Sequence, residues 1–303
     1  MRGIWAIVGR TFSDWYQDRA QRLGAALAYY TVFALAPSLV IVIGVAGLVF
    51  GRETAQGHIL EQIRDLVGEQ GAQVVEATIQ SAQDPKASLT AISLGLMTLV
   101  FGLWGVFSEL QDALNTIWGV TPKPGRGVMG VLKDRVWSFA LVVGIGFVLL
   151  VSLALTALLA MLGTYFGHLL PLPTVLLQTI NFAISFVVIT VLFAFTFKLL
   201  PDVKVAWQDV WLGAAVTSVL FSVGKLLIGL YLGKSGVASV FGAAGSLVVI
   251  LVWVYYSAQI LYLGAEFTKV WTRWRGRGFV ADERAVPVTA EARAEQGLGP
   301  KPS

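Results

Sequence analysis

Six long apolar runs, separated by polar connections, set the pattern of hydrophobic and polar positions along the chain. The runs cover residues 28–50, 89–107, 136–162, 175–197, 210–232 and 243–265. Each has 19 to 27 residues, and a helix needs roughly 20 apolar residues to cross the hydrocarbon core of a bilayer. Lys225 is the single charged residue within the six runs. The pattern predicts an all-α fold, a polytopic membrane bundle of six transmembrane helices accompanied by amphipathic interfacial helices.

The composition also favours a membrane protein. Of 303 residues, 56% are hydrophobic and 13% are charged, and the mean hydropathy is +0.73. Soluble domains carry about 25% charged residues, so this composition disfavours a soluble enzyme. The 17 Phe, 10 Trp and 8 Tyr disfavour a disordered chain. Because the chain has no cysteine, disulfides, thiolate metal sites and cysteine nucleophiles are excluded.

Lys and Arg are distributed unevenly between the connections. Alternate connections and both terminal segments together hold 17 of these cations, whereas the other connections hold four. Cytoplasmic segments of membrane proteins carry the excess of Lys and Arg. We therefore expect a multi-pass protein of the bacterial inner membrane, with the N- and C-termini in the cytoplasm.

The predicted spans divide the chain into three parts. Residues 1–27 place Trp and other apolar residues among arginines, which is typical of a cytoplasmic interfacial helix, although a plain flanking anchor would give the same pattern. Residues 28–267 form the expected transmembrane domain. Residues 268–303 are basic and become polar, with Gly and Pro near the end, and we expect a disordered cytoplasmic tail.

Two connections have amphipathic patterns of their own. Residues 51–88 hold six carboxylates and three cations, with apolar residues at helical spacing. We expect an external amphipathic loop, and either a solvated acidic face or a surface on which an envelope protein docks. Residues 108–124 predict a short cytoplasmic-side helix that ends at the Thr121–Gly125 break.

Catalytic and metal-binding patterns are scarce. The two histidines, His58 and His168, lie 110 residues apart, and the chain has no HExxH, Walker or GxSxG motif. We therefore expect no catalytic residue, no metal, no cofactor and no nucleic acid partner, and we expect that the protein is not an enzyme. Membrane lipids are the partners that the composition predicts.

The predicted spans carry a small set of polar residues that could line a pathway or a binding site. On the fifth span, Lys225 follows Ser218 and Ser222; an intramembrane charge indicates a functional site unless its side chain snorkels to the interface. The fourth and sixth spans carry polar stripes, which could equally be interhelical hydrogen bonds. The stripes consist of Gln178 and Asn181 on the fourth span and of Tyr255, Gln259 and Glu266 on the sixth. Pro37 and Pro201 predict breaks in the helical hydrogen bonding.

Several motifs in order along the chain resemble the YihY/BrkB family of bacterial inner-membrane proteins. They are Leu27–Thr31 with Tyr29 and Tyr30, Leu35–Pro37, Ala113–Trp118 with Asn115, Gly213–Ala214, Gly224–Lys225, Gly242–Ala243, Trp253–Tyr256 and Leu263–Glu266 with Gly264. Together they span roughly residues 20–270. Phe241 departs from the tyrosine expected before Gly242.

The resemblance implies a polytopic protein without a characterised activity and gives added weight to Lys225 and Glu266. Links of some family members to envelope lipids imply a transporter or flippase for a lipid or other amphiphile. The alternative is an envelope scaffold or assembly factor that transports nothing. An older ribonuclease label for the family is generally regarded as a misassignment, and the lack of a metal-binding pattern also disfavours it.

Overall fold

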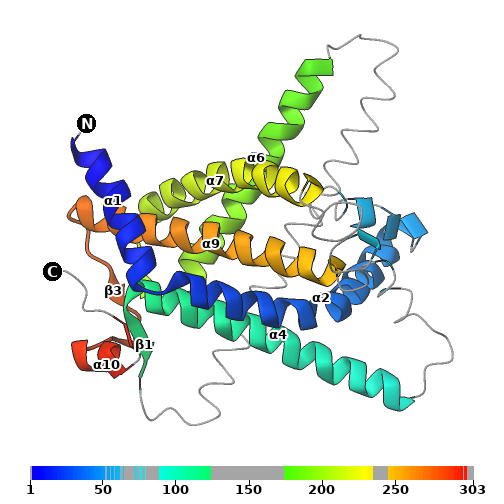
Figure 1. The fold of residues 1–303 in the computed structure, drawn as a ribbon, viewed down its shortest axis with the longest axis horizontal. Helices are drawn as coiled ribbons and strands as arrows, with labels where there is room; N and C mark the ends of the chain where they lie inside the picture. The colour runs from blue at the N-terminus through cyan, green and yellow to red at the C-terminus, as the bar shows by residue number, and fades with distance from the viewer. Residues whose placement is uncertain are drawn as a thin grey trace. The chain divides into compact units, whose positions relative to one another are not determined.

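The computed structural model describes residues 2–51, scattered positions between 53 and 79, and residues 89–123, 174–234, 245–295 and 297–298. Most of these residues are helical (Figure 1). The long helices are α1 (Arg2–Gln17), α2 (Ala20–Phe50), α4 (Leu89–Trp118), α6 (Thr174–Leu199), α7 (Trp207–Lys234) and α9 (Gly245–Trp274). The predicted span 136–162, most of loop 51–88 and Gly242 lie outside the described residues.

Three helices of the described part are long and apolar enough to cross a membrane. Their membrane-length segments are Phe182–Leu199 in α6, Trp207–Tyr231 in α7 and Leu247–Trp274 in α9. They correspond to the fourth, fifth and sixth predicted spans. The mainly helical fold and these three apolar helices agree with the predicted membrane bundle, while the number of six transmembrane helices stays a prediction.

Two expected boundaries need correction. The segment 1–27 is not a single helix, because Arg19 has a positive φ of 51° and separates α1 from α2. Residues 108–118 are not a separate helix, because α4 continues without a break from Leu89 to Trp118. Helix α2 continues through Pro37, where proline has no N–H to donate to the helical hydrogen bonding, and α6 ends at Leu199, two residues before Pro201.

The chain forms two compact units, which are described separately. Unit 1 contains Met1–Phe12, Leu114–Leu220 and Gly264–Ser303, and unit 2 contains Ser13–Ala113 and Phe221–Leu263. In unit 1, the start of α7 lies beside the end of α9 (Figure 1). A Cβ on Gly213 would lie 1.8 Å from Thr268 Oγ1, and one on Gly264 would lie 1.9 Å from Thr217 Oγ1. Each glycine therefore leaves room for a threonine side chain of the opposite helix. The two contacts share one antiparallel register of α7 and α9.

The C-terminal tail is ordered where the structure describes it, which corrects the expectation of disorder. Strand β1 (Val120–Pro122) pairs with β4 (Ala285–Pro287), and β2 (Val203–Lys204) pairs with β3 (Val280–Ala281), both antiparallel. A short helix, α10 (Ala290–Glu295), follows. Backbone pairing with the connections after α4 and α6 holds the tail in place, despite its polar composition. The all-α prediction did not include these two small sheets of two- and three-residue strands, although the described chain is mostly helical.

Unit 2 contains close approaches between α2, α4 and α9. A Cβ on Gly105 would lie 2.4 Å from the Tyr30 ring, and one on Gly102 would lie 3.0 Å from the Ala34 Cα atom. These glycines let α4 lie directly against α2, as Figure 1 shows. Gly24 of α2 gives similar room to Gln259 of α9. Small residues allow this kind of packing in membrane helices.

Candidate functional site

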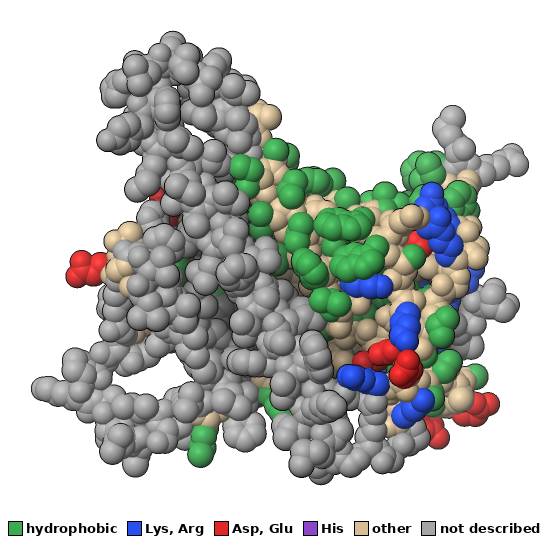
Figure 2. Space-filling view, turned by 180° about the vertical axis from the view of Figure 1, so that it is seen from behind, with side chains coloured by type: hydrophobic (Ala, Val, Ile, Leu, Met, Phe, Trp, Pro, Cys, Tyr) green, Lys and Arg blue, Asp and Glu red, His purple; other side chains and the backbone are tan. Residues whose placement is uncertain are grey.

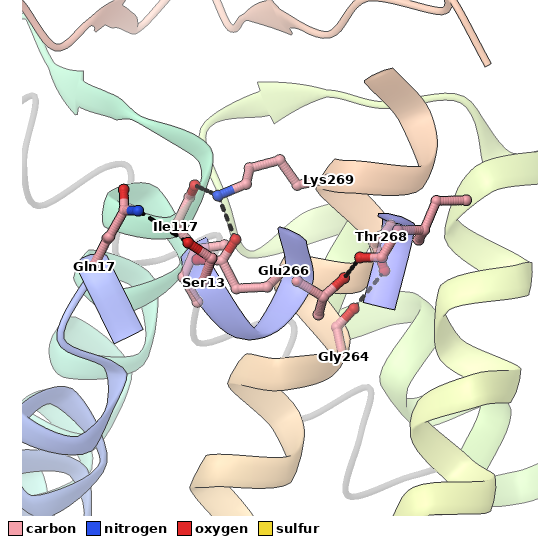
Figure 3. Close-up of polar contacts among 9 residues, drawn as sticks. Ser13, Gln17, Ile117, Gly264, Glu266, Thr268 and Lys269 are labelled. Atoms are coloured by element: carbon pink, nitrogen blue, oxygen red, sulfur yellow. Dashed lines mark hydrogen bonds and ion pairs between the residues drawn. The ribbon is translucent and has the colours of Figure 1, made fainter. Parts of the chain in front are cut away.

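A buried ion pair forms the centre of the candidate site in unit 1. Glu266 and Lys269 lie three residues apart on α9, and both side chains are fully buried. Lys269 Nζ forms an ion pair with Glu266 and donates a hydrogen bond of 3.1 Å to the Ile117 carbonyl oxygen (Figure 3). Because Ile117 is in the last turn of α4, its carbonyl has no partner within that helix. Lys269 therefore caps α4 from a neighbouring helix, where its charge also suits the helix dipole.

The ion pair is costly to bury. Removing two charges from water costs several kcal/mol per ion, which good geometry and further hydrogen bonds must offset. In a membrane helix, ionisable residues are rare and mark pathways, relays or binding sites by default. The pair lies within the apolar segment Leu247–Trp274. The arrangement fixes α9 to the end of α4.

A second polar contact lies next to this end of α4. Asn115 Nδ2 donates a 2.8 Å hydrogen bond to Asp202 Oδ2, and the Asp202 backbone N–H donates one of 2.8 Å to Asn115 Oδ1. This reciprocal pair fixes the connection after α6 against α4. Trp118 is also buried and meets the Phe279 ring edge-on at 4.9 Å. The Ala113–Trp118 motif thus anchors the end of α4 on two other segments.

Outside the apolar segments, Lys204 connects β2 to the residues after β3. Its ammonium lies 3.3 Å from Asp282 and 3.5 Å from Glu283. The hydrogen bond to Asp282 and the charge of Glu283 raise the pKa of Lys204. Partial burial opposes ionisation of Asp282, but the Glu283 backbone N–H and Lys204 outweigh it and lower the pKa of Asp282.

The other candidate residues of unit 1 contribute to helix packing where their side chains are described. Ser218 is fully buried, donates to the Ala214 carbonyl and accepts a 3.0 Å hydrogen bond from Thr190 of α6. This contact is an interhelical hydrogen bond between α6 and α7. Gln178 and Asn181 lie on α6, and only their backbone is described.

In unit 2, the remaining candidates lie at different depths. Lys225 is exposed on α7 and Ser222 is half-buried. Tyr255 and Gln259 are half-buried on α9, and Gln259 Nε2 donates a 3.3 Å hydrogen bond to the Ala20 carbonyl. The expected convergence of these residues with Glu266 on one pathway stays a prediction.

The aromatic motif residues also differ in exposure. Tyr29 and Tyr30 are exposed, and Trp253 contacts the Phe221 ring at 6.4 Å. Tyr30 also lies against Gly105, where it lines the close approach of α2 and α4. Only the backbone of Pro37 is described, within α2.

Some residues of the site were not found from the sequence. Asp202 and Asp209 gave no signal, because their partners lie tens of residues away in the chain. Asp209 is fully buried in the first turn of α7, with Arg275 and Arg277 nearby. The sequence does carry a signal for Lys269, since Glu266 and Lys269 have the i, i+3 spacing of a helical ion pair. Within the described residues, no group of three or more His, Asp or Glu side chains could hold a metal ion.

Comparison with known proteins identifies the family. The family model described as virulence factor BrkB matches residues 11–288. The chain belongs to the BrkB family. The match includes α2, α4, α6, α7 and α9, together with the strands that pair with the tail. The resemblance seen in the sequence motifs is thereby confirmed.

Relatives of this BrkB-family chain are named as membrane proteins. A UPF0761 membrane protein of Halorhodospira halophila is 27% identical over 90% of this chain and 59% of its own length. One of Pseudomonas aeruginosa is 28% identical over 82% of this chain and 58% of its own length. The chain thus spans less than two thirds of the length of these relatives. No solved structure matches the chain.

Proposed function

We propose that this chain moves a lipid or another amphiphile of the cell envelope, as an inner-membrane transporter or flippase. The observation that carries the proposal is the position of Lys225. This cation is exposed on α7 among exposed apolar side chains. The apolar neighbours are Val223, Leu226, Leu227, Leu230 and Tyr231, with exposed fractions of 51–66%. On an apolar helix face, a cation can bind an anionic headgroup while the acyl chains contact the leucines beside it.

The depth of Lys225 supports this role. It lies six residues before Tyr231, where the apolar segment of α7 ends, or about 9 Å along the helix axis. An ammonium left in hydrocarbon costs at least about 2.5–3.5 kcal/mol on insertion scales. A headgroup phosphate would offset that cost, as would water reached by snorkelling. The buried Glu266–Lys269 pair adds a second charged site on α9, which suits the same proposal.

A second candidate function is an envelope scaffold or assembly factor that transports nothing. The reciprocal glycine–threonine contacts of α7 and α9 favour it, because helices packed so closely leave little room between them. The hydrogen bond from Thr190 to Ser218 also pairs polar side chains of α6 and α7 with each other. A scaffold predicts that Lys225 only snorkels and that its loss has no effect on function.

Reconstitution of the full chain separates the two candidates. The purified protein is placed in vesicles that contain fluorescent phosphatidylglycerol, and bleaching by dithionite measures how fast the lipid changes leaflet. We expect faster exchange than in protein-free vesicles, and loss of most of the increase in Lys225→Met. Lys234→Met, at the end of the same helix, is the matched control and should match the wild type.

Two results would count against this proposal, the first against transport itself and the second against the role of Lys225. Exchange no faster than in protein-free vesicles, with protein of native helical content, would favour the scaffold. Wild-type exchange by Lys225→Met would remove Lys225 from the pathway.

We also propose that the protein is not an enzyme, and we expect the purified chain to leave RNA intact. Cleavage abolished by substitution of His58 or His168, which lie outside the described residues, would contradict this.

A further inference from the structure

Exposed tryptophans mark one end of α7 and α9 in unit 1. The contact of Gly213 with Thr268 sets the antiparallel register of the two helices. Trp207 lies six residues before Gly213, and Trp274 lies six residues after Thr268, so the register places both at one level. Trp207, Trp211 and Trp274 are 42%, 44% and 59% exposed. At this level the apolar segment of α7 begins and the apolar segment of α9 ends.

Cations lie beside Trp207 and beside Trp271, whose ring stacks on that of Trp274. Lys198 Nζ lies 5.5 Å from the centre of the Trp207 ring, and the Arg275 guanidinium lies 5.1 Å from that of Trp271. Both distances are within the range of cation–π attraction. Arg277 donates a 2.8 Å hydrogen bond to Gln208 Oε1 of α7. On the face drawn in Figure 2, Lys and Arg side chains likewise gather beside hydrophobic ones.

A buried carboxylate lies beneath the two arginines. Asp209 Oδ1 lies 3.9 Å from Arg275 Nη1 and 3.6 Å from Arg277 Nη1. Asp209 is fully buried, and neither of its carboxylate oxygens accepts a hydrogen bond within the described part of the chain. Its charge therefore draws both guanidiniums toward α7, while each stays more than 40% exposed. The arginines thus keep N–H donors at the surface.

The amphipathic helix α1 extends the same surface. A Cβ on Gly3 would lie 3.6 Å from the Trp274 ring, so the first turn of α1 lies against this tryptophan. Ile4 and Trp5, which follow in α1, are 68% and 75% exposed. Apolar side chains and indoles that surround exposed arginines are suited to the headgroup region of a bilayer.

We infer that this end of α7 and α9 binds the phosphate of an anionic phospholipid. We call the surface the Trp–Arg collar and define it by Lys198, Trp207, Trp211, Trp274, Arg275 and Arg277. The arginines hold the phosphodiester, because a guanidinium matches the phosphate oxygens with paired N–H donors. The indoles contact the glycerol and the first methylenes of the acyl chains. With Asp209 included, the collar retains a net charge of +2, which favours an anionic lipid over a zwitterionic one.

Native mass spectrometry of the full chain in detergent tests the collar. The protein is titrated with phosphatidylglycerol and, separately, with phosphatidylcholine of the same acyl chains. We expect tighter binding of phosphatidylglycerol. Each basic residue near an anionic headgroup contributes about fivefold in affinity, so Arg275→Gln with Arg277→Gln should weaken binding about 30-fold. The matched control, Lys123→Gln with Lys234→Gln, removes the same charge outside the collar and should retain the affinity.

A third variant separates a built site from diffuse charge. Arg275→Lys with Arg277→Lys keeps the charge but loses the planar donors, and we expect it to bind phosphatidylglycerol more weakly than the wild type while it still prefers this lipid to phosphatidylcholine. Wild-type affinity in this variant would overturn the proposal, as would equal affinity for the two lipids or an unaffected Gln variant with native helical content. Displacement of phosphatidylglycerol by inorganic phosphate would indicate a free-phosphate site instead. The collar does not depend on lipid transport, so failure of the vesicle assay would leave this test unchanged.

Discussion

At the scale of single residues, two glycines determine how closely α7 and α9 approach. Gly213 and Gly264 each face a threonine of the opposite helix, at distances where no real Cβ could fit. Thr217 and Thr268 in turn hydrogen-bond to the carbonyls of Gly213 and Gly264 on their own helices. The hydroxyl of each threonine is therefore hydrogen-bonded within its own helix, and the threonine side chain packs against the glycine of the opposite helix.

Gly264→Ala should destabilise the protein by about 1–3 kcal/mol, because a methyl group would be forced into the packed Thr217 side chain. Thr217→Ala in the same chain removes the nearest atom and should recover part of the loss. Gly229→Ala on α7 is the control, since a Cβ there meets nothing within 4 Å. Thermal unfolding in detergent measures all three, and an unaltered Gly264→Ala variant would contradict the packing.

The Glu266–Lys269 pair should behave as a coupled unit. Lys269→Met leaves a carboxylate buried without its partner and should cost about 3–5 kcal/mol. The same variant combined with Glu266→Leu removes both charges and should be less destabilised than Lys269→Met alone. The double-mutant cycle is measured by unfolding in detergent. Additive effects of the two substitutions would show that the charges do not interact.

At the scale of elements, the apolar runs predicted the long helices but not all of their limits. Hydropathy marks membrane-length segments, whereas helix ends depend on local geometry, such as the positive φ of Arg19. Strands β2 and β3 have two residues each, too few for a period of two to show. Glu266 was found because it lies on a helical stripe. Asp202 and Asp209 were missed because their partners are distant in the sequence. Only the folded chain brings Asn115 to Asp202 and Arg277 to Asp209.

The order of the tail gives a prediction for hydrogen exchange. Backbone N–H groups of Lys123 and Val288 donate to the carbonyls of Arg284 and Gly119, beyond the paired residues of β1 and β4. In the full chain in detergent, we expect peptides that cover residues 280–288 to exchange more slowly than the same peptides in the denatured chain. Exchange of residues 280–288 as fast as in the denatured chain would show that the tail is disordered, as its composition predicted.

At the scale of the whole molecule, charge and apolar length together predict the topology. Seventeen of the 22 Lys and Arg residues are placed on one side if all six predicted spans cross. The apolar segments of α6, α7 and α9 are consistent with crossing. The Trp–Arg collar and the end of α4 then belong to the cytoplasmic side, where we expect both termini.

Crossing of the membrane in this orientation underlies the proposed roles of Lys225 and Glu266, and cysteine labelling tests it directly. Because the chain has no cysteine, one introduced at Gln70 or Ser303 is the only thiol. An impermeant maleimide added to cells with a permeabilised outer membrane should label Gln70→Cys and leave Ser303→Cys unlabelled until the inner membrane is opened. Labelling of Ser303→Cys before the inner membrane is opened, or labelling of both positions alike, would contradict the predicted topology.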